Sequence, residues 1–353
     1  MSPSSGIEIE TLEGSALESP AVCAAWQTFL RSQHGFASDL RWLVAISRGL
    51  GHKQYGLIAR RADETVGVLP LAFVKSALFG KFLVSLPYLN TAGLVATDQE
   101  VAGALIEEAA ELADRLDVRY LELRHEEEIS HTRFTDQRTD KVHMRLALAP
   151  SSDELWKQIS PKVRNQIRKG EKQGFEVHWG GIEQAADFYA VFSRNMRDLG
   201  TPVFGKRLFA EILQAFPEEA ELCTLCSDSE PVAGALLIHG PEATQVPSAS
   251  ALRAFNSKNV NMLMYWHLLC RAVEKGQPIF DFGRSSLESN TFRFKKQWGA
   301  EPKPAVWQYY VRKGDISSMR PESRKYRYMI KAWQHLPVSM TRWIGPAIVR
   351  GIP

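Results

Sequence analysis

Helical and extended stretches alternate along the first 150 residues. Apolar side chains recur every three or four positions over residues 20–33 and 99–116, as they do on one face of a helix. Short runs rich in valine, leucine and aromatic residues, typical of β-strands, cover residues 55–60, 66–74, 119–123 and 142–148. The pattern predicts an α/β unit over residues 1–150, which ends at the Ala149-Pro150 pair.

The same alternation returns after residue 150, where Ser152 precedes the two carboxylates of a predicted first helical turn. Helices are predicted up to residue 172 and over residues 183–197, 206–216, 261–275 and 290–298. Strands are predicted over residues 175–179, 221–225, 232–239, 244–250, 279–282 and 306–312. Two units of similar size, 1–150 and 151–313, with antiparallel consecutive strands, predict a duplicated α/β (α+β) fold. A basic helical tail follows over residues 314–353.

The composition is that of a globular protein. Of 353 residues, 44% are hydrophobic and 24% are charged, which excludes a collagen, a coiled coil and disorder throughout the chain. Four scattered cysteines are too few for a disulfide framework, so we expect them to be reduced. The first twenty residues contain no lysine or arginine, and no apolar run reaches the about 20 residues of a membrane-spanning helix. These features predict a cytoplasmic protein.

The net charge of +3 is unevenly distributed. From residue 314 onward there are seven basic and two acidic residues, whereas the rest of the chain is slightly acidic. Trp333 and Trp343 lie among these cations, a mixture typical of segments that contact an anionic membrane. The tail predicts peripheral attachment to the inner membrane, and the alternative is a helix that packs back on the first unit with its cations in solvent.

A second basic cluster, KQISPKVRNQIRKGEK, covers residues 157–172. Ser160 and Pro161 suit the N-cap and the first position of a helix. Helical spacing places three apolar residues toward a core: Ile159, Val163 and Ile167. It also aligns three cations in an adjacent stripe: Arg164, Arg168 and Lys172. The stripe predicts a site for the phosphates of tRNA or of a diphosphate-bearing precursor, and a merely solvated face is the alternative.

Polar residues follow a predicted buried strand in the motif FDFGRS, residues 280–285. Asp281 lies near the end of the strand and Arg284 directly after a glycine, at the edge where α/β sheets bind ligands. A short helical turn with Phe294 and Lys295 comes next. The segment predicts a binding or catalytic site, and the alternative is packing together with a surface lysine pair.

Other motifs carry less chemistry. His125 and His131 flank three glutamates without the spacing of a metal site, so we expect an acidic loop and no metal. Cys223 and Cys226 form a lone CxxC, which we expect to be inert. The chain has neither a P-loop nor a dinucleotide-binding GxGxxG motif.

Several runs of the chain, in one order, resemble the FemAB-related proteins of the PEP-CTERM and exosortase exopolysaccharide system. The likeness extends from Tyr55 to Tyr310 and is carried by GVLPLAFVKSALFGKFLVSLPYLNTAG, SRNMRDLGTPVFGKRLF, PSASALRAFN, NMLMYW, FDFGRS and FRFKKQWGAEPKP. The resemblance implies a tandem pair of GNAT-like acetyltransferase domains with mixed, largely antiparallel sheets. It also implies a role in envelope or exopolysaccharide biogenesis.

Better-known Fem relatives transfer an amino acid from aminoacyl-tRNA to an amine of a peptidoglycan precursor. Their FKxxFG-like motif, which lies beside the reacting groups, matches Phe294 and Lys295, with Trp298 in place of the second aromatic residue. Their substrate-phosphate arginine is similar to Arg197 in NMRDLG. The tyrosine that the relatives have near the PSASALR strand is absent here.

The resemblance implies a transferase, in which a preorganised cation stabilises the carbonyl oxygen while an amine attacks. We expect Lys295 in that role, with Phe294 beside it and with Asp281 ordering the substrates or accepting a proton. Arg197 and Arg284 are expected to hold phosphates of the donor or the acceptor.

Three functions stay open. The first is a Fem-type N-acyltransferase, with tRNA as a partner, that moves an aminoacyl or acyl group to an amine of a phosphate-bearing or lipid-linked sugar precursor. The second uses acyl-CoA as donor, although the one Q/R-x-x-G-x-G/A match, Arg342 to Ala347, lies in the tail and contains a proline. The third is a non-catalytic protein that binds a lipid-linked sugar. None of the three requires a tightly bound cofactor.

Overall fold

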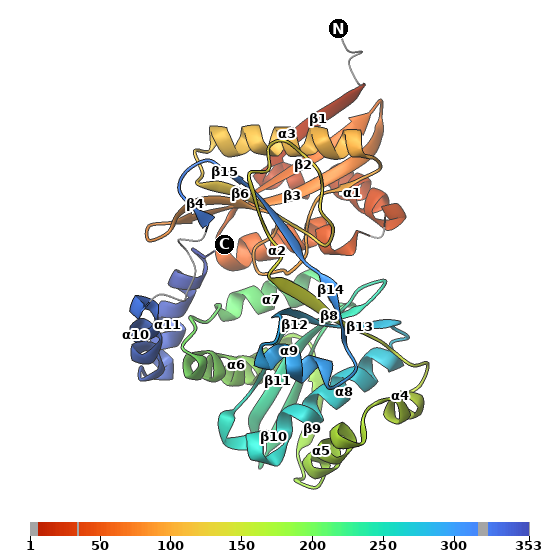
Figure 1. Cartoon of the computed structure of the whole chain (residues 1–353), viewed down its shortest axis with the longest axis vertical. Helices are drawn as coiled ribbons and strands as arrows, with labels where there is room; N and C mark the ends of the chain where they lie inside the picture. The colour runs from red at the N-terminus through yellow and green to blue at the C-terminus, as the bar shows by residue number, and fades with distance from the viewer. Residues whose placement is uncertain (1–5, 34, 317–323, 353) are drawn as a thin grey trace. The chain divides into compact units, whose positions relative to one another are not determined.

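The computed structural model describes residues 6–33, 35–316 and 324–352, with only the backbone of residues 324–328. The chain forms two compact units, both drawn in Figure 1. Unit 1 comprises Met1–Thr139, Pro304–Arg320 and Arg350–Pro353, and unit 2 comprises Asp140–Lys303 and Pro321–Val349. These boundaries differ from the predicted ones at residues 150 and 313, because each unit takes one strand from the stretch of sequence assigned to the other.

Unit 1 contains a mixed eight-stranded sheet in the order β1-β2-β3-β4-β6-β15-β7, with the short β5 paired to β3. Paired strands are antiparallel except β4 and β6, which run parallel. The strands are β1 (Ile7–Glu13), β2 (Lys53–Arg61), β3 (Glu64–Ser76), β4 (Gly80–Val84), β5 (Val95–Ala96), β6 (Tyr120–His125), β7 (Asp136–Arg138) and β15 (Val306–Val311). The helices are α1 (Pro20–Gln33), α2 (Leu40–Leu50) and α3 (Gln99–Arg115), with 3-10 helices at Gly14–Glu18 and Phe36–Ser38.

Helices cover both faces of the unit 1 sheet, α3 on one and α1 with α2 on the other (Figure 1). Alternate residues of a strand point to opposite faces, so Leu57 and Ala59 pack with α3 whereas Gly56 meets α1 and the 3-10 helix before it. A Cβ atom at Gly56 would lie 2.4 Å from Cδ2 of Leu17 and 3.1 Å from Cζ3 of Trp26. The close approach therefore requires glycine at this position of β2.

A buried ion pair lies where β4 and β6 stop pairing. Nη2 of Arg124 is 2.7 Å from Oε1 of Glu122, and both side chains are 4% exposed. Arg124 also donates from Nη1 to the carbonyl of Leu89 at 2.6 Å, and its guanidinium carbon lies 4.0 Å from the ring centroid of Trp307. The loop that follows β4 therefore folds around a cation whose charge is neutralised by a carboxylate on its own strand.

Unit 2 contains a seven-stranded sheet in the order β14-β8-β13-β12-β11-β10-β9. Its strands are β8 (Lys141–Ala147), β9 (Glu176–Gly180), β10 (Ala220–Ser227), β11 (Glu230–His239), β12 (Thr244–Ala251), β13 (Ile279–Ser286) and β14 (Glu301–Pro304). Its helices are α4 (Ser152–Gln158), α5 (Pro161–Glu171), α6 (Ala185–Leu199), α7 (Lys206–Ala215), α8 (Val260–Glu274), α9 (Asn290–Lys296), α10 (Arg324–Gln334) and α11 (Val338–Val349), with 3-10 helices at Ile182–Gln184 and Arg253–Lys258. Strands β12 and β13 are paired in parallel, whereas β13 with β8, β12 with β11, β11 with β10 and β10 with β9 are antiparallel pairs.

The predicted core face of the basic helix is confirmed in unit 2. Ser160 caps α5, since its Oγ accepts a hydrogen bond from the Val163 nitrogen at 3.4 Å. The three predicted core residues are buried among α8 and strands β10, β11 and β13: Ile159, Val163 and Ile167. The other face of the sheet is covered by α6, where Phe188 contacts Gly234 of β11.

Two predicted strands do not join the sheet of the unit to which their place in the sequence assigns them. The predicted strand 142–148 is β8, which pairs with β13 of unit 2 and places Arg145 opposite Asp281. The predicted strand 306–312 is β15, which lies between β6 and β7 of unit 1 with Val306 opposite His125. Hydrophobic patterning identifies each run as a strand, but it does not specify which of two similar sheets the strand joins.

The described part of the tail forms α10 and α11, which pack on α6 of unit 2. Nε2 of Gln334 donates to the carbonyl of Asp198 at 3.0 Å, and a Cβ atom at Gly345 would lie 2.9 Å from the Val203 nitrogen. These helices thus belong to unit 2, which corrects the alternative prediction of a tail helix packed on the first unit. Residues 317–323 of the predicted tail lie outside the described residues, and none of the helices described is long and apolar enough to cross a membrane.

Candidate active site

Strands β12 and β13 run parallel but pair only at their beginnings. Thr244 lies opposite Phe280 and Gln245 opposite Asp281, and these are the pairs that join the two strands. Farther along, β12 stays beside β11 and β13 stays beside β8. The sheet of unit 2 therefore opens between the carboxyl-terminal halves of two neighbouring parallel strands, and such ends are where α/β sheets bind ligands.

A bulge in β13 borders this opening and is held by two side chains of opposite charge. The register with β8 shifts between Asp281 and Arg284, and Gly283 between them has a φ of 78°. Oδ1 of Asp281 accepts a hydrogen bond from the Gly283 nitrogen at 2.7 Å. Nζ of Lys295, on α9, donates to the carbonyls of Gly283 and Arg284, both at 3.0 Å. Because bulges re-aim side chains, these bonds set the backbone from which Arg284 extends.

Asp281 and Lys295 are both buried, with 4% and 8% exposure. Oδ2 of Asp281 accepts a hydrogen bond from Nε of Arg145 at 3.0 Å, so this carboxylate is paired as well as bonded to the bulge. Burial lowers the pKa of Lys295 to about 8, and the nearby charge of Asp281 acts in the opposite direction. An ammonium group has three donors, and Lys295 uses two of them on carbonyls. One N–H of Lys295 has no partner among the described residues.

Phe294 belongs to an aromatic cluster that joins α9 to the sheet. Its ring centroid lies 5.0 Å from that of Tyr265 and 6.5 Å from that of Trp298, both in edge contact. Tyr265, on α8, stacks on Phe282 of the bulge with the centroids 5.6 Å apart. Phe294 therefore holds α9, and with it Lys295, against β13.

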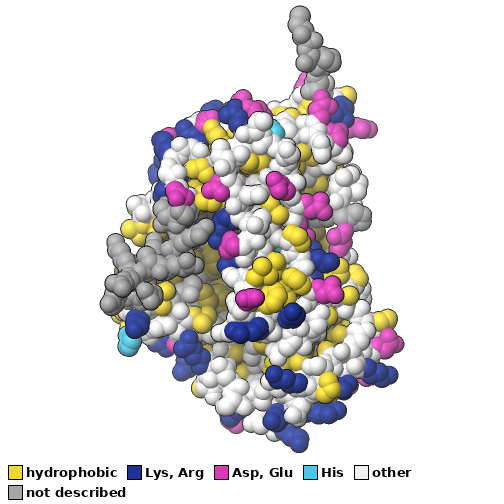
Figure 2. Space-filling model, viewed as in Figure 1, with side chains coloured by type: hydrophobic (Ala, Val, Ile, Leu, Met, Phe, Trp, Pro, Cys, Tyr) yellow, Lys and Arg dark blue, Asp and Glu magenta, His cyan; other side chains and the backbone are white. Residues whose placement is uncertain are grey.

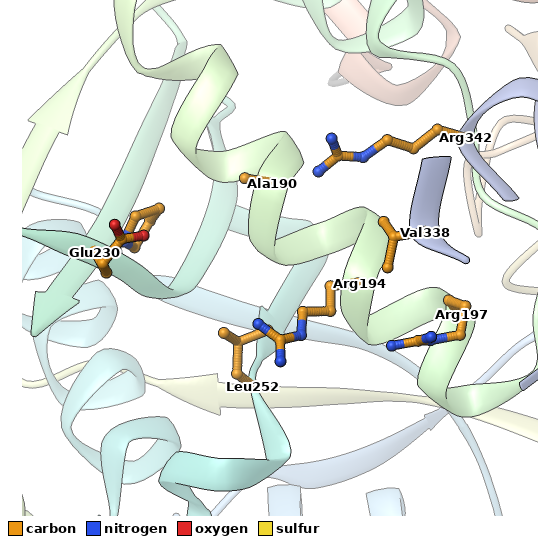
Figure 3. Close-up of a pocket in the computed structure, with 8 residues that line it drawn as sticks. Ala190, Arg194, Arg197, Glu230, Leu252, Val338 and Arg342 are labelled. Atoms are coloured by element: carbon orange, nitrogen blue, oxygen red, sulfur yellow. The ribbon is translucent and has the colours of Figure 1, made fainter. Parts of the chain in front are cut away.

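A pocket of about 440 Å³ opens in unit 2 beside α6 and α11 (Figure 3). It is lined by Ala190, Arg194, Arg197, Glu230, Pro231, Leu252, Val338 and Arg342. Arg194 and Arg197 lie about one turn apart on α6, Arg342 extends from α11, and Glu230 lies on the far side (Figure 3). Three guanidinium groups against one carboxylate favour an anionic ligand.

Two of these arginines are anchored by neighbouring groups. Nε of Arg197 lies 2.7 Å from Oδ1 of Asp198, and its Nη1 donates at 3.0 Å to the carbonyl of Leu336, between α10 and α11. Nε of Arg342 donates to Oγ of Ser193 at 2.8 Å. Both side chains are therefore preorganised at the pocket and also tie the tail helices to α6.

Arg194 lacks the anchoring contacts that Arg197 and Arg342 make. Its side chain is exposed and has no ion pair or hydrogen bond with any described residue. Figure 3 shows its guanidinium group beside Leu252, at the wall opposite α11. A guanidinium without a protein partner at the rim of a basic pocket is available to pair with a phosphate or carboxylate of a ligand.

The predicted stripe on α5 is separate from this pocket, because α5 packs on α8 whereas the pocket adjoins α6. Nη1 of Arg164 donates to the carbonyl of Trp156 at 3.2 Å, and the guanidinium carbon of Arg168 lies 5.3 Å from the ring centroid of Trp156. Lys172, the last residue of the stripe, is exposed. Lysine and arginine side chains are spread over the surface of unit 2 around α5 and α9 (Figure 2).

Some residues of the site are not in the predicted set. Arg194 lies three residues before the predicted Arg197, so helical spacing could have predicted from the sequence that both lie on one face. Arg342 carries no such signal, since it joins the pocket only through the packing of α11 on α6. Ser285, which follows Arg284, is 4% exposed, and its Oγ has no hydrogen-bond partner among the described residues.

Comparison with known proteins places this geometry in a fold family. Residues 157–296 match the family model of an acetyltransferase (GNAT) domain. The match includes β12, β13, the bulge and α9, so unit 2 contains a GNAT-type domain. A search of curated protein sequences finds no significant match to the chain.

Solved structures extend the likeness to both units. The chain is similar to FemX, with a TM-score of 0.62 and 15% identity over 86% of this chain and 97% of that one. A tandem GNAT protein from the clavulanic acid biosynthesis pathway has a TM-score of 0.56 and 13% identity, over 86% and 98% of the two chains. L-PGS from Bacillus licheniformis has a TM-score of 0.55 and 14% identity, over 93% and 97%. The predicted tandem GNAT-like fold with mixed, largely antiparallel sheets is thereby confirmed.

Proposed function

We propose that the protein is a GNAT-type acyltransferase that moves an aminoacyl or acyl group to an amine of an anionic acceptor. The observation that carries the proposal is the pocket of Arg194, Arg197 and Arg342 in the unit that matches the acetyltransferase model. The acceptor class is a phosphate-bearing or lipid-linked sugar precursor of an envelope polymer or exopolysaccharide. The narrower link to exopolysaccharide synthesis is supported by the sequence motifs alone.

The pocket would bind the anionic group of the acceptor. Arg197 and Arg342 are already oriented by Asp198 and Ser193, so little side-chain entropy remains to be lost when a phosphate binds. Arg194 would supply a further pair of N–H donors, and a guanidinium can bind phosphate in bidentate fashion. Glu230, at the far side, is positioned to repel a second anionic group or to accept from a sugar hydroxyl.

The transfer itself would take place at the opening between β12 and β13. The neutral amine attacks the carbonyl carbon of the donor, the new C–N bond forms, and the bond from that carbon to the donor's oxygen or sulfur breaks. The proton lost by the nitrogen ends on the leaving group. Negative charge builds on the carbonyl oxygen in between, and the remaining N–H of Lys295, together with Arg284, would stabilise it.

Asp281 and Phe294 would act as positioning residues in this scheme. Asp281 bonds the Gly283 nitrogen and Arg145, so its carboxylate is already used by the protein. Phe294 packs on Tyr265 and keeps Lys295 under the bulge. Both would therefore act through the geometry of Lys295 and Arg284 rather than by taking up the proton themselves.

Two donor classes, aminoacyl-tRNA and acyl-CoA, fit the chemistry. Residues 252–259, between β12 and α8, contain no glycine, so this connection lacks the glycine-rich loop that cradles a pyrophosphate. The other candidate loop, Arg342 to Ala347, lies inside α11 and is helical. Both points favour an aminoacyl-tRNA donor over acyl-CoA.

Replacing Arg194 by alanine tests the pocket. Loss of a charge-assisted hydrogen bond costs about 1.5–3 kcal/mol, so we expect KM for the acceptor to rise about 10- to 100-fold with kcat little changed. The measurement is transfer from radiolabelled aminoacyl-tRNA or acyl-CoA to amino sugars with and without a diphosphate. Arg207→Ala, at a 71% exposed arginine of α7, is the matched control and should behave as wild type. An unchanged KM in Arg194→Ala rejects the pocket as the acceptor site, and binding without transfer from either donor supports the non-catalytic alternative.

The cations of α5 are proposed to bind the tRNA or another polyanion. If Arg164, Arg168 and Lys172 neutralise phosphates, binding weakens linearly on a logarithmic salt scale, with a slope set by the number of phosphates contacted. A variant with alanine at all three positions should show a shallower salt slope for tRNA than wild type in fluorescence anisotropy. Arg164→Ala alone is the control for structural effects, because this side chain also donates a hydrogen bond to the Trp156 carbonyl. Identical slopes for wild type and the triple variant contradict the proposal.

A further inference from the structure

The outer face of α11 is apolar and exposed. Trp343 is 83% exposed and Met340 is 44% exposed, although both are large hydrophobic residues. The inner face of the helix is buried on unit 2, with Thr341 at 1% and Val349 at 8% exposure and Gly345 against Val203. The contacts that hold α11 in the fold are thus made without the outer face.

No charged residue interrupts this face. Met340, Trp343 and Ala347 follow one another at intervals of three and four residues, so they form one stripe along the helix, and all three are exposed. Helices of globular proteins carry polar residues on the solvent side, and a helix that is apolar on both faces is normally buried. The outer stripe of α11 therefore lacks a partner in the chain as described.

Basic residues accompany the stripe. Residues 324–349, which form α10 and α11, contain five lysines and arginines and no aspartate or glutamate. Lys331, on α10, is exposed, and so is Met329 beside it, at 56%. An uncharged apolar stripe next to a segment of purely positive charge is complementary to an anionic lipid surface, because tryptophan suits the headgroup region and each cation contributes about 1 kcal/mol near anionic lipids.

We infer that α10 and α11 form a docking surface for an anionic bilayer, with Trp343 and Met340 inserted at the headgroup level and Lys331 against lipid phosphates. The inference goes beyond the proposed transfer, because it requires neither the arginine pocket nor a bound donor. The docking surface and the arginine pocket share helix α11, because the pocket residues Val338 and Arg342 extend from the helix that is proposed to meet the lipid. An acceptor confined to the membrane surface would reach the pocket from there.

The test is co-sedimentation of the full chain with vesicles of phosphatidylglycerol and phosphatidylcholine, or of phosphatidylcholine alone. We expect binding to the anionic vesicles only, weakened by salt. The double variant Trp343→Ser, Met340→Ser changes the outer stripe and leaves the inner contacts intact, and it should bind at least about tenfold more weakly. Leu78→Ser, at a 75% exposed leucine of unit 1, is the matched control and should bind as wild type. Calorimetry of both variants verifies that they fold.

Three results would overturn the inference. The wild-type chain staying in the supernatant with anionic vesicles excludes a lipid partner. Equal binding of the double variant and wild type moves any lipid contact away from α11. A wild-type dimer in solution that becomes a monomer in the double variant, with no lipid binding by either, assigns the stripe to a second copy of the chain. Loss of transfer in Arg194→Ala leaves the inference unchanged, so the two proposals fail separately.

Discussion

Lys295→Met is expected to lower the transfer rate at least about 100-fold while leaving KM for the acceptor nearly unchanged. The variant removes the donor that holds the carbonyls of Gly283 and Arg284, and it removes the charge proposed to face the carbonyl oxygen. Loss of one preorganised donor to an oxyanion costs about 10²–10³ in kcat. Since the acceptor anion is proposed to bind at the arginine pocket, its affinity should not depend on Lys295. Single-turnover transfer measures the effect, and Lys296→Met, at the exposed neighbouring lysine, is the control.

The same substitution should also change how the free energy of unfolding depends on pH. The folded pKa of Lys295 is lowered to about 8, below the about 10.4 of an unfolded lysine, so the unfolded chain holds the extra proton between these values. Wild-type stability therefore rises with pH across this window, by up to about 3 kcal/mol. Lys295→Met has no group that titrates at this position, so the stability of wild type relative to the variant should increase from pH 8 to 10.4. If the free energies of unfolding of the two proteins, measured with urea, stay a constant distance apart over that range, the pKa of Lys295 is not lowered in the folded protein.

Arg124→Met is expected to destabilise unit 1 by about 3–5 kcal/mol, because the substitution leaves Glu122 as an uncompensated buried charge. The carbonyl of Leu89 also loses its donor. Denaturant unfolding followed by near-ultraviolet circular dichroism measures the change. Arg115→Met removes an exposed ion pair with Glu108 and should change stability by less than about 1 kcal/mol.

A double variant separates the ion pair from packing. If buried charge is the cause, Glu122→Gln combined with Arg124→Met should be less destabilising than Arg124→Met alone, since no charge is then left unpaired. Equal losses in the single and double variants would instead attribute the effect to the contact between Arg124 and the Trp307 ring, which lies 4.0 Å away.

Much of the secondary structure could be predicted from the sequence, because local signals agree. The helix predicted over residues 99–116 is α3 (Gln99–Arg115), where Asp98 caps the first turn by accepting from the Val101 nitrogen. Strand β1 and helix α2 were not predicted. The alternation in β1 is that of an exposed edge strand. Helix α2 does carry a helical period, with Leu43, Ile46 and Leu50 buried, and Asp39 caps its start and Gly51 its end, so the signal for this helix was present in the sequence.

The candidate site was predictable in part. Asp281, Arg284 and Lys295 do lie together at one bulge, as their position after a buried strand suggests. The sequence does not show that Nζ of Lys295 donates to backbone carbonyls of the bulge. The bulge depends on the register between β13 and β8, two strands far apart in the chain. The arginine pocket depends likewise on the packing of α11, which no local pattern specifies.

The exchange of β8 and β15 has a consequence for biosynthesis. The edge of β6 that receives β15 stays open until residues 306–311 have been made, after nearly all of unit 2. At about 5–20 residues per second, synthesis from His125 to Val306 takes roughly 10–40 s. Throughout that interval the nascent first unit presents unpaired backbone groups that can join another strand. The yield of this protein in a cell should therefore depend on chaperones that bind the incomplete sheet, and a chain truncated before β15 should aggregate.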